Sequence, residues 1–504
     1  MTSYWLRGNT GRFGPLEEPG RKVTVAVIGG GVTGITAAYL LARAGRSVAL
    51  LERGEVLARD TGHTTAHLTC VTDTPLSTLA DRFGREHATA AWDAGLAALH
   101  AVHSHVQAEA IACDFAWVPG YLHAASADDT AQAERLEREA ALGDELGFDT
   151  EYVEQNPLTA TPAMRIADQA RIDPVRYLRG LLAAAVGRGC AVYERSNVEQ
   201  VYDDPLAVVA NGVRLECDYV VVATHNPLAR LGSWLGATLL QTKLALYTTY
   251  VVAGRAARGA VPDALFWDTS DPYRYLRVTP DGDDDLVIYG GADHKTGQHD
   301  DEEDRFAGLE RSLAALVPGV ALSARWSGQV IEPVDGLPYI GETAPRQFVA
   351  TGFAGNGMTF GTLAGLMAAD AVIGRQNPWS GLFDVGRTRA GSAWNYLLEN
   401  KDYPYYMIRD RFAGRETRTL RALRRGEGGL VEHDGQRVAA FRADDGTMTL
   451  RSATCTHMGC QVRWNGADRT WDCPCHGSRF APDGAVLAGP ATAPLEAVRV
   501  QAPK

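Results

Sequence analysis

Residues 23–52 read VTVAVIGGGVTGITAAYLLARAGRSVALLE, and this stretch decides the fold of the first part of the chain. It opens with a short β-branched run typical of a strand buried on both faces. Three glycines follow, then an alanine- and leucine-rich run closed by Gly45, and then a second apolar run that ends at Glu52. The pattern predicts a β-α-β unit.

The glycines between the first strand and the helix have the spacing of a dinucleotide-binding turn. A pyrophosphate needs close backbone approach and free N–H groups at a helix N-terminus, and Gly29, Gly31 and Gly34 meet both needs. Glu52 lies at the end of the second strand, where a carboxylate accepts hydrogen bonds from ribose hydroxyls. The fingerprint alone leaves FAD and NAD open.

The rest of the chain predicts an interrupted first domain and a small all-β module. Helical patterns cover residues 79–112, 127–147 and 170–189, and buried-strand patterns return at residue 191 and at 218–223. Residues 238–288 favour long strands with turns, which predicts an inserted antiparallel sheet. The strand-then-glycine pattern resumes over residues 348–374. Later, Asp-Gly pairs at 434–435, 445–446 and 483–484 separate short strands and predict the all-β module.

Composition excludes several classes of protein. A chain of 504 residues exceeds what one hydrophobic core usually supports, so several folding units are expected. A net charge of -12 disfavours a nucleic-acid partner. No apolar run is long enough to span a bilayer, and the start has no signal-type stretch, so a cytoplasmic protein is expected.

Three further segments carry a family resemblance: TGHTTAHLT at residues 61–69, DGLPYIG at 335–341 and TGFAGNGMTFG at 351–361. With the glycine turn they resemble the D-amino-acid oxidase and glycine oxidase superfamily of FAD enzymes over residues 22–373. The resemblance implies an α/β FAD-binding domain of the Rossmann-like, glutathione-reductase type with an inserted antiparallel-sheet substrate subdomain. It also implies a non-covalent FAD, with a covalent link through His63 or His67 as the alternative.

The same resemblance implies positions around the cofactor. Thr64 and Thr65 are expected near the pyrophosphate and Val198 near the adenine. Residues 355–359 are expected to approach the isoalloxazine at a helix N-terminus, where the dipole stabilises the anion formed on reduction. The residues expected to contact FAD are Gly29, Gly31, Val32, Thr33, Gly34, Glu52, Arg53, Thr64, Thr65, Val198, Gly355, Asn356, Gly357, Met358 and Thr359.

Two cysteine- and histidine-containing segments close to the C-terminus predict a second cofactor. They read CTHMGC at residues 455–460 and CPCHGS at 473–478. A Rieske 2Fe-2S centre needs one Cys and one His from each of two loops, and these segments resemble that pattern. The expected ligands are Cys455, His457, Cys473 and His476. Zinc is the alternative, but a C-x-H half does not match common zinc spacings, and six soft ligands exceed one tetrahedral site.

The loops resemble the bc-complex type of Rieske protein in particular. That resemblance implies a disulfide between Cys460 and Cys475 and a covering loop at residues 489–491. Ser478 matches a hydroxyl that donates to a bridging sulfide, whereas Phe480 stands where high-potential members carry a Tyr. We therefore expect a midpoint potential within the Rieske range of roughly −150 to +300 mV but below its top.

These patterns divide the chain into three expected parts. Residues 1–376 form the FAD-dependent oxidoreductase, with FAD-binding parts at about 22–100, 165–235 and 330–376 and a substrate subdomain at about 101–164 and 236–329. Residues 377–416 form a connector. Residues 417–504 form the Rieske domain.

Residues for substrate capture are weakly specified by the sequence. Tyr273, Tyr275 and Arg277 alternate onto one face of a predicted strand, where rings and a guanidinium can hold a carboxylated amine. An ordinary half-exposed strand is the alternative. His294 and His299, with Asp293 and Asp300, superficially resemble the iron site of Rieske oxygenases, but in those enzymes the iron domain follows the Rieske module, so a surface loop is expected.

Three hypotheses for function follow. The first is an FAD-dependent dehydrogenase that oxidises a C–N bond of an amine or amino acid and passes electrons through the Rieske cluster to an external acceptor. The second reverses the electron flow, so that an external donor reduces the cluster and then the flavin for oxygenation or reduction. The third is a non-enzymatic electron carrier or redox sensor. The external partner is a ferredoxin-like protein, a cytochrome or a quinone.

Overall fold

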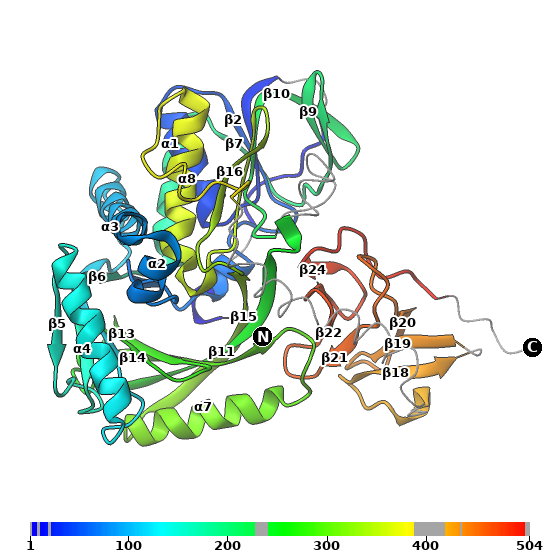
Figure 1. Ribbon diagram of the computed structural model, residues 1–504. Helices are drawn as coiled ribbons and strands as arrows, with labels where there is room; N and C mark the ends of the chain where they lie inside the picture. Colours follow the sequence, from blue (N-terminus) through cyan, green and yellow to red (C-terminus); the bar gives the residue numbers. More distant parts are fainter. Residues whose placement is uncertain are drawn as a thin grey trace, which may run out of the picture.

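The computed structural model describes residues 3–7, 11–18, 22–226, 240–387, 419–433 and 436–498. Figure 1 shows two large sheets in the first three-quarters of the chain and a separate group of short strands, in orange and red, beside β11 and β15. Among the described residues, no helix is both long enough and apolar enough to cross a membrane.

The predicted β-α-β unit forms the centre of the first sheet. Strand β1 (Val23–Ile28) pairs in parallel with β2 (Val48–Leu51) and with β10 (Val213–Val222). Both faces of β1 are buried, which explains its continuous apolar run. The sheet order is β16-β17-β10-β1-β2-β7, with β9 paired to β10 and β8 paired to β9. The remaining strands are β7 (Ala191–Tyr193), β8 (Val198–Asp203), β9 (Leu206–Ala210), β16 (Tyr339–Ala344) and β17 (Gln347–Thr351).

Helices α1 (Val32–Arg43) and α8 (Gly357–Ile373) pack closely against each other beside this sheet (Figure 1). A Cβ added at Gly361 would lie 2.5 Å from Val32 Cγ1, and one added at Gly365 would lie 2.6 Å from Thr36 Cβ. Glycine is therefore required at both positions for this approach. The packing fixes the N-terminus of α8 near the N-terminus of α1.

The second sheet has nine strands in the order β15-β11-β14-β13-β12-β4-β6-β3, with β5 joined to β6. Its pairs are antiparallel except β12 with β4, which is parallel, so the expected purely antiparallel sheet is a mixed one. The strands are β3 (His67–Leu68), β4 (Ala116–His123), β5 (Thr150–Val153), β6 (Ala163–Arg171), β11 (Leu244–Ala257), β12 (Leu265–Asp268), β13 (Arg274–Asp281), β14 (Asp284–Lys295) and β15 (Ala321–Pro333). Helix α7 (Glu302–Leu316) packs on β11 and β14 through Phe306, Leu309 and Leu313.

Two predicted helices differ from the observed ones. Residues 79–112 were expected as one helix, but the chain forms α2 (Leu76–Phe83) and α3 (Arg85–Ala108), because Gly84 between them has φ +87°. The helix expected over 170–189 is α5 (Pro174–Gly187), because β6 extends to Arg171 and the Asp173 side chain then caps the helix. Helix α4 (Thr130–Glu145) lies within the range predicted for it.

The chain passes repeatedly between the two large sheets. Strand β3 and most of β6 belong to the second sheet, although they fall inside the ranges 22–100 and 165–235 expected for the FAD-binding part. Residues 388–416 of the expected connector lie outside the described residues.

The C-terminal module consists of two small antiparallel sheets, as the turn pattern predicts. One contains β18 (Gly428–His433), β19 (Gln436–Arg442) and β20 (Met448–Ser452). The other contains β21 (Arg463–Asn465), β22 (Thr470–Asp472), β23 (Arg479–Phe480) and β24 (Val486–Ala488). The expected Asp-Gly turns at 445–446 and 483–484 are present, with Gly446 at φ +94° and Gly484 at φ +87°. The pair at 434–435 lies outside the described residues.

Candidate functional site

The glycine turn between β1 and α1 brings the backbone to the edge of a large cavity. Gly29 has φ +111°, and its N–H donates to the Leu51 carbonyl at 2.8 Å. A Cβ added at Gly34 would lie 1.9 Å from the Gly29 carbonyl oxygen, so only glycine allows α1 to begin this close to the turn. Gly31 is the N-cap of α1 and leaves the helix N-terminus open to the cavity.

Glu52 and Arg53 follow β2 at the same edge of the sheet. The Glu52 carboxylate accepts from the Gly30 N–H and from the Gly54 N–H, both at 2.8 Å. These bonds fix the carboxylate at the cavity wall, and each oxygen keeps a lone pair for a hydroxyl donor. Arg53 also lines the cavity, and its guanidinium donates to the Leu487 carbonyl of the C-terminal module at 2.7 Å.

The cavity has a volume of about 600 Å³, within the range of small-molecule and cofactor sites. Of the fifteen residues expected to contact FAD, all but Gly34 and Thr359 line it. Gly34 packs behind the turn, and Thr359 is buried behind the wall. The expected residues that line the cavity are Gly29, Gly31, Val32, Thr33, Glu52, Arg53, Thr64, Thr65, Val198, Gly355, Asn356, Gly357 and Met358.

The N-terminus of α8 points into the cavity and is tied to the segment after β3. Asn356 Nδ2 donates to the Val71 carbonyl at 2.8 Å, and Thr359 Oγ1 donates to the Thr69 carbonyl at 2.9 Å. Gly355 is exposed to the cavity just before the helix. A helix N-terminus held in this way favours negative charge in front of it.

The two cysteine-containing loops of the C-terminal module form tight turns that face each other. The Cys455 N–H donates to the Cys460 carbonyl and the Cys473 N–H to the Ser478 carbonyl, both at 2.8 Å. Gly459 and Gly477 take positive φ, at +80° and +65°, so each turn depends on a glycine.

The side chains expected as cluster ligands come together between these loops. Cys455 and Cys473 are buried free thiols within hydrogen-bonding contact, and the rings of His457 and His476 have centroids 4.9 Å apart. Nδ1 of His457 is buried, and no described group hydrogen-bonds to it. Two thiols and two imidazoles, one with an unpaired buried nitrogen, fit the donor set of a Rieske cluster.

Cys460 and Cys475 form a disulfide that joins the two loops. The Cys473 sulfur lies within 4.8 Å of the two disulfide sulfurs, which places the cross-link beside the expected ligands. Because disulfide sulfurs are not thiolates, the other two cysteines are the ones available to a metal.

The loop at residues 489–491 lies against the second cysteine loop. The Ala491 N–H donates to the Ser478 hydroxyl at 3.1 Å, and Gly489 packs on the Ser478 backbone. The Ser478 hydroxyl also contacts the Cys455 sulfur. Phe480 is fully buried in the core of the module.

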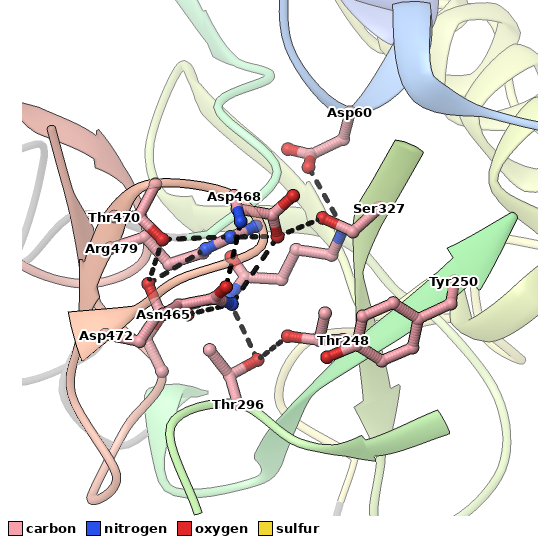
Figure 2. A network of polar contacts seen from close by, with 12 residues as sticks. Asp60, Thr248, Tyr250, Thr296, Ser327, Asn465, Asp468, Thr470, Asp472 and Arg479 are labelled. Carbon is pink, nitrogen blue, oxygen red and sulfur yellow. Dashed lines mark hydrogen bonds and ion pairs between the residues drawn. The ribbon is translucent and has the colours of Figure 1, made fainter. Parts of the chain in front are cut away.

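A buried polar network joins the C-terminal module to the second sheet (Figure 2). Asp468 accepts from the Ser327 hydroxyl of β15 at 2.5 Å and from the Arg479 guanidinium at 2.7 Å. Arg479 also donates to Asp472 at 3.1 Å. Burial raises the pKa of Asp468, but Arg479 and Ser327 outweigh that effect and the net shift is downward. The carboxylate therefore stays ionised and accepts charge-assisted hydrogen bonds.

The second cysteine loop itself docks on the second sheet. Gln329 Nε2 donates to the Gly477 carbonyl at 2.8 Å, and Gln298 Nε2 donates to the Pro474 carbonyl at 3.1 Å. The Gln329 N–H donates to Asp60 Oδ1 at 3.4 Å, and Asp60 lines the FAD-type cavity. Gln329 therefore contacts both the cysteine loop and the cavity wall.

Two features of this interface were missed from the sequence. His457 and His476 share a small pocket with residues of the first module, among them Asn226, Leu244 and Leu246. Residues 487–489, at the end of β24, line the large cavity. Neither feature has a signal in the sequence, because both depend on how the two modules pack.

The expected substrate residues on β13 and just before it separate into two groups. Tyr273 and Tyr275 line the cavity. Arg277 is fully buried and is not among the described residues that line it. Its guanidinium donates to the carbonyls of Ala66 and Ile172, so it stabilises the chain beneath the cavity rather than a substrate carboxylate. The expectation for Arg277 is corrected accordingly.

The residues that resemble an iron site do not form one. His294 is buried, with Nε2 2.8 Å from the Tyr250 hydroxyl and Nδ1 2.8 Å from the Lys295 carbonyl. His294 is therefore part of the packing under β14 and not the surface loop residue that was expected. Asp293 faces the large cavity instead.

Comparison with known proteins agrees with both sites. A family model for FAD dependent oxidoreductases (DAO) matches residues 24–371, and a Rieske 2Fe-2S domain model matches residues 417–499. YhfW of Bacillus subtilis, named as a Rieske 2Fe-2S iron-sulfur protein, is 30% identical over 98% of this chain and 97% of its own. The gamma-glutamylputrescine oxidoreductase of Escherichia coli is 24% identical over 74% of this chain and 89% of its own. The structure of glycine oxidase from Geobacillus kaustophilus has a TM-score of 0.61 and 22% identity, and covers 74% of this chain and all of its own.

Fold and sites together define an FAD-dependent oxidoreductase with a C-terminal Rieske domain. The chain belongs to the DAO family of FAD dependent oxidoreductases, and its cofactors are FAD and a Rieske-type 2Fe-2S cluster.

Proposed function

We propose that this protein is a dehydrogenase that oxidises a C–N bond of an amine or amino acid and delivers the electrons, through its own cluster, to an external one-electron acceptor. The names of two similar proteins support the substrate class: one is a glycine oxidase and the other acts on gamma-glutamylputrescine. The acceptor is a ferredoxin-like protein, a cytochrome or a quinone.

When bound, FAD accepts an electron pair from a substrate and a 2Fe-2S cluster carries single electrons. The chain's own residues prepare this chemistry. The N-terminus of α8 directs its dipole into the cavity, and Asn356 and Thr359 hold it there. Tyr273 and Tyr275 present hydroxyls and rings to the substrate side. We propose Cys455, His457, Cys473 and His476 as the residues that hold the cluster.

One observation carries the proposal that electrons move within the chain. The loop that contains Cys473 and His476 is hydrogen-bonded by Gln329 to a strand of the oxidoreductase module. The same glutamine contacts Asp60 in the wall of the FAD-type cavity. This arrangement holds the proposed cluster ligands and the cavity at a fixed separation, which favours an internal relay over a diffusing partner for the first transfer.

An anaerobic screen tests the proposal. Primary amines, N-methylated amines and amino acids are added to the holoprotein while flavin absorbance and the EPR signal of the cluster are followed. We expect an active compound to bleach the flavin first and to produce the signal of the reduced cluster afterwards. In a Cys473→Ser variant the same compound should bleach the flavin without any cluster signal.

Bleaching that requires a reduced ferredoxin-like donor, with no effect of any amine or amino acid, would overturn the proposal. That result would favour reversed electron flow or an electron carrier without a substrate. Rapid reoxidation of the flavin by oxygen at a rate that matches turnover would instead indicate an oxidase.

A further inference from the structure

Two carboxylates face the cavity near the N-terminus of α8. Asp73 lies between β3 and α2, and Asp293 lies on β14. Asp73 Oδ2 accepts from the Gly355 N–H at 2.7 Å. A Cβ added at Gly355 would lie 2.9 Å from that oxygen and 2.5 Å from the Tyr273 hydroxyl. Asp73 and Tyr273 therefore meet at the end of the cavity where the family resemblance places the isoalloxazine.

Asp293 has a buried acceptor that the described part of the protein leaves unsatisfied. Its Oδ1 is inaccessible and has no hydrogen-bond partner among the described residues, while Thr249 contacts the carboxylate and the Tyr275 hydroxyl. Burial, with a smaller contribution from Asp73, raises the pKa of Asp293 to about 7. This oxygen is therefore free to accept a hydrogen bond from a molecule bound in the cavity.

The surroundings of Asp73 also suit a bound molecule. The side chain is open to the cavity, yet the cavity walls limit its contact with bulk water, and this burial raises its pKa. Tyr273 and Tyr275 stand beside the two carboxylates with their rings 5.7 Å apart. Burial raises the pKa of both tyrosines, so they remain neutral donors. Aromatic rings and carboxylates together suit a cation.

The cations near the two carboxylates are engaged elsewhere. Arg305 donates to Asp301 at 2.8 Å and to the Ala292 carbonyl at 2.8 Å, and it is not among the described residues that line the cavity. Arg277 donates to backbone carbonyls, as described above. Burial lowers the pKa of His67 to about 3, so that its ring is uncharged at neutral pH.

Among the described residues, three arginines line the cavity. Arg53 interacts with Glu52 and Asp60 at the dinucleotide end, and Arg59 lies close to Gly54 on the same side. Arg135, on α4, is exposed to solvent. Arg135 is one helical turn from Glu139, which accepts from the Ser77 N–H of α2, so a guanidinium is available to a substrate carboxylate on that side of the cavity. An amine nitrogen beside Asp73 and Asp293 would face two acids.

From this arrangement we propose that the amine nitrogen of the substrate is bound as a cation by Asp73 and Asp293. The inference rests on the proposed function and assigns the residues that hold the amine nitrogen of its substrate.

Acetamidinium and acetate test the inference on the holoprotein. The two ions have the same shape and opposite charges, and neither has a C–H bond next to an amine nitrogen that the flavin can oxidise. Each is titrated at constant ionic strength while the flavin absorbance spectrum is recorded. We expect acetamidinium to bind at least about tenfold more tightly than acetate, because like charges in a desolvated site repel strongly.

Substitution of each carboxylate adds a second measurement. Asp293→Asn and Asp73→Asn should each weaken acetamidinium binding by at least about tenfold, since each removes one charge from the site. Asp284→Asn is the matched control, because Asp284 is an exposed carboxylate on the same strand as Asp293. It should leave the affinity unchanged. Flavin content and thermal unfolding of each variant confirm that the site is intact.

The wild-type protein supplies a third measurement that needs no variant. Acetamidinium keeps its charge through the neutral range, whereas Asp293 ionises as the pH rises through about 7. Its affinity should therefore increase as the pH rises through that value, with Asp73 and Arg305 as the other charged groups acting on Asp293. Acetate should show no such increase.

The outcomes separate this inference from the proposed function. Acetate binding as tight as acetamidinium binding, or variants at both aspartates with unchanged acetamidinium affinity, overturns the cation site whatever the amine screen shows. If acetamidinium binds as expected but no amine or amino acid bleaches the flavin, the proposed function fails while the cation site stands.

Discussion

The cavity for FAD takes its walls from segments spread between residues 28 and 489, among them the glycine turns and the N-termini of α1 and α8. The cluster site instead takes its proposed ligands from four side chains within residues 455–476. We expect the flavin to be held by many weak contacts, and the iron to be held by a few strong bonds to its ligands. The two sites should therefore respond very differently to single substitutions, and substitutions at the interface between them should affect stability rather than cofactor content.

The largest expected effect is at the cluster. Cys473→Ser removes one of four proposed ligands, so we expect complete loss of cluster iron with FAD content unchanged. Iron analysis and flavin absorbance of the purified protein measure both cofactors. Cys217→Ser is the control, because Cys217 is a buried free cysteine in the first module. Wild-type iron content in the Cys473 variant would contradict the assigned ligand set.

A substitution in the glycine turn should weaken the binding of FAD without abolishing it. Gly34→Ala places a Cβ 1.9 Å from the Gly29 carbonyl oxygen, and overpacking of this kind costs about 1–3 kcal/mol, or on the order of tenfold in FAD affinity. Iron content should stay at the wild-type level. Gly308→Ala in α7, where no atom lies within 4 Å of the added Cβ, should instead stabilise the protein by about 0.5–1 kcal/mol. Unchanged FAD retention in the Gly34 variant would rule out the turn as a pyrophosphate site.

At the interface, Asp468→Asn should weaken the docking of the two modules. The side chains of Asp468 and Arg479 are 7% and 10% exposed, and loss of one partner of a buried pair costs about 3 kcal/mol. Because the pKa of Asp468 is lowered in the folded protein, its contribution should be complete above about pH 4 and lost as the pH falls below that. Thermal unfolding and limited proteolysis measure the change.

A matched exposed pair provides the control for that experiment. Asp444→Asn breaks the ion pair with Arg469, whose side chains are 70% and 49% exposed. Exposed pairs contribute little, so this variant should unfold like the wild type. Equal effects of the two substitutions would show that the buried network does not hold the modules together.

The smallest expected effect on stability is that of Gln329→Leu. It removes the bond to the Gly477 carbonyl and the 3.3 Å bond to Thr296, a loss of about 1–2 kcal/mol. We expect slower reduction of the cluster after flavin bleaching, because the cysteine loop is held less firmly. Gln200→Leu, at an exposed position on β8, is the control and should leave the rates of flavin bleaching and of cluster reduction unchanged. An unchanged cluster rate in the Gln329 variant would exclude Gln329 from the relay.

The sequence predicted the local structure of both sites well. In residues 23–52, apolar runs and glycines follow one another in a regular order. This local pattern alone predicts the turn and the position of Glu52. The cysteine loops are also local, since Gly459 and Gly477 make each turn within a few residues. In both places the chemistry depends on contacts between residues close in sequence, which a pattern can reveal.

The remaining parts depend on packing between distant segments. Tyr275 and Arg277 share a face of β13 as alternation requires, but Ala66 covers the strand at Arg277 and the cavity ends before it. The role of Asp73 depends on Gly355, which is far from it in sequence, and their contact exists only because α8 packs against the segment after β3. The alternation of a strand predicts which face a side chain lies on, but it does not predict which distant segment packs over that face.

Strand β24 has a consequence for how the protein matures. Residues 487–489 complete a cavity begun by the glycine turn near residue 29, and Arg53 binds the Leu487 carbonyl across the junction. Enclosure of the flavin therefore has to wait until the ribosome has made residues 487–489 of the C-terminal module. A chain without the Rieske domain, or one in which another electron carrier replaces it, would leave the cofactor open on that side.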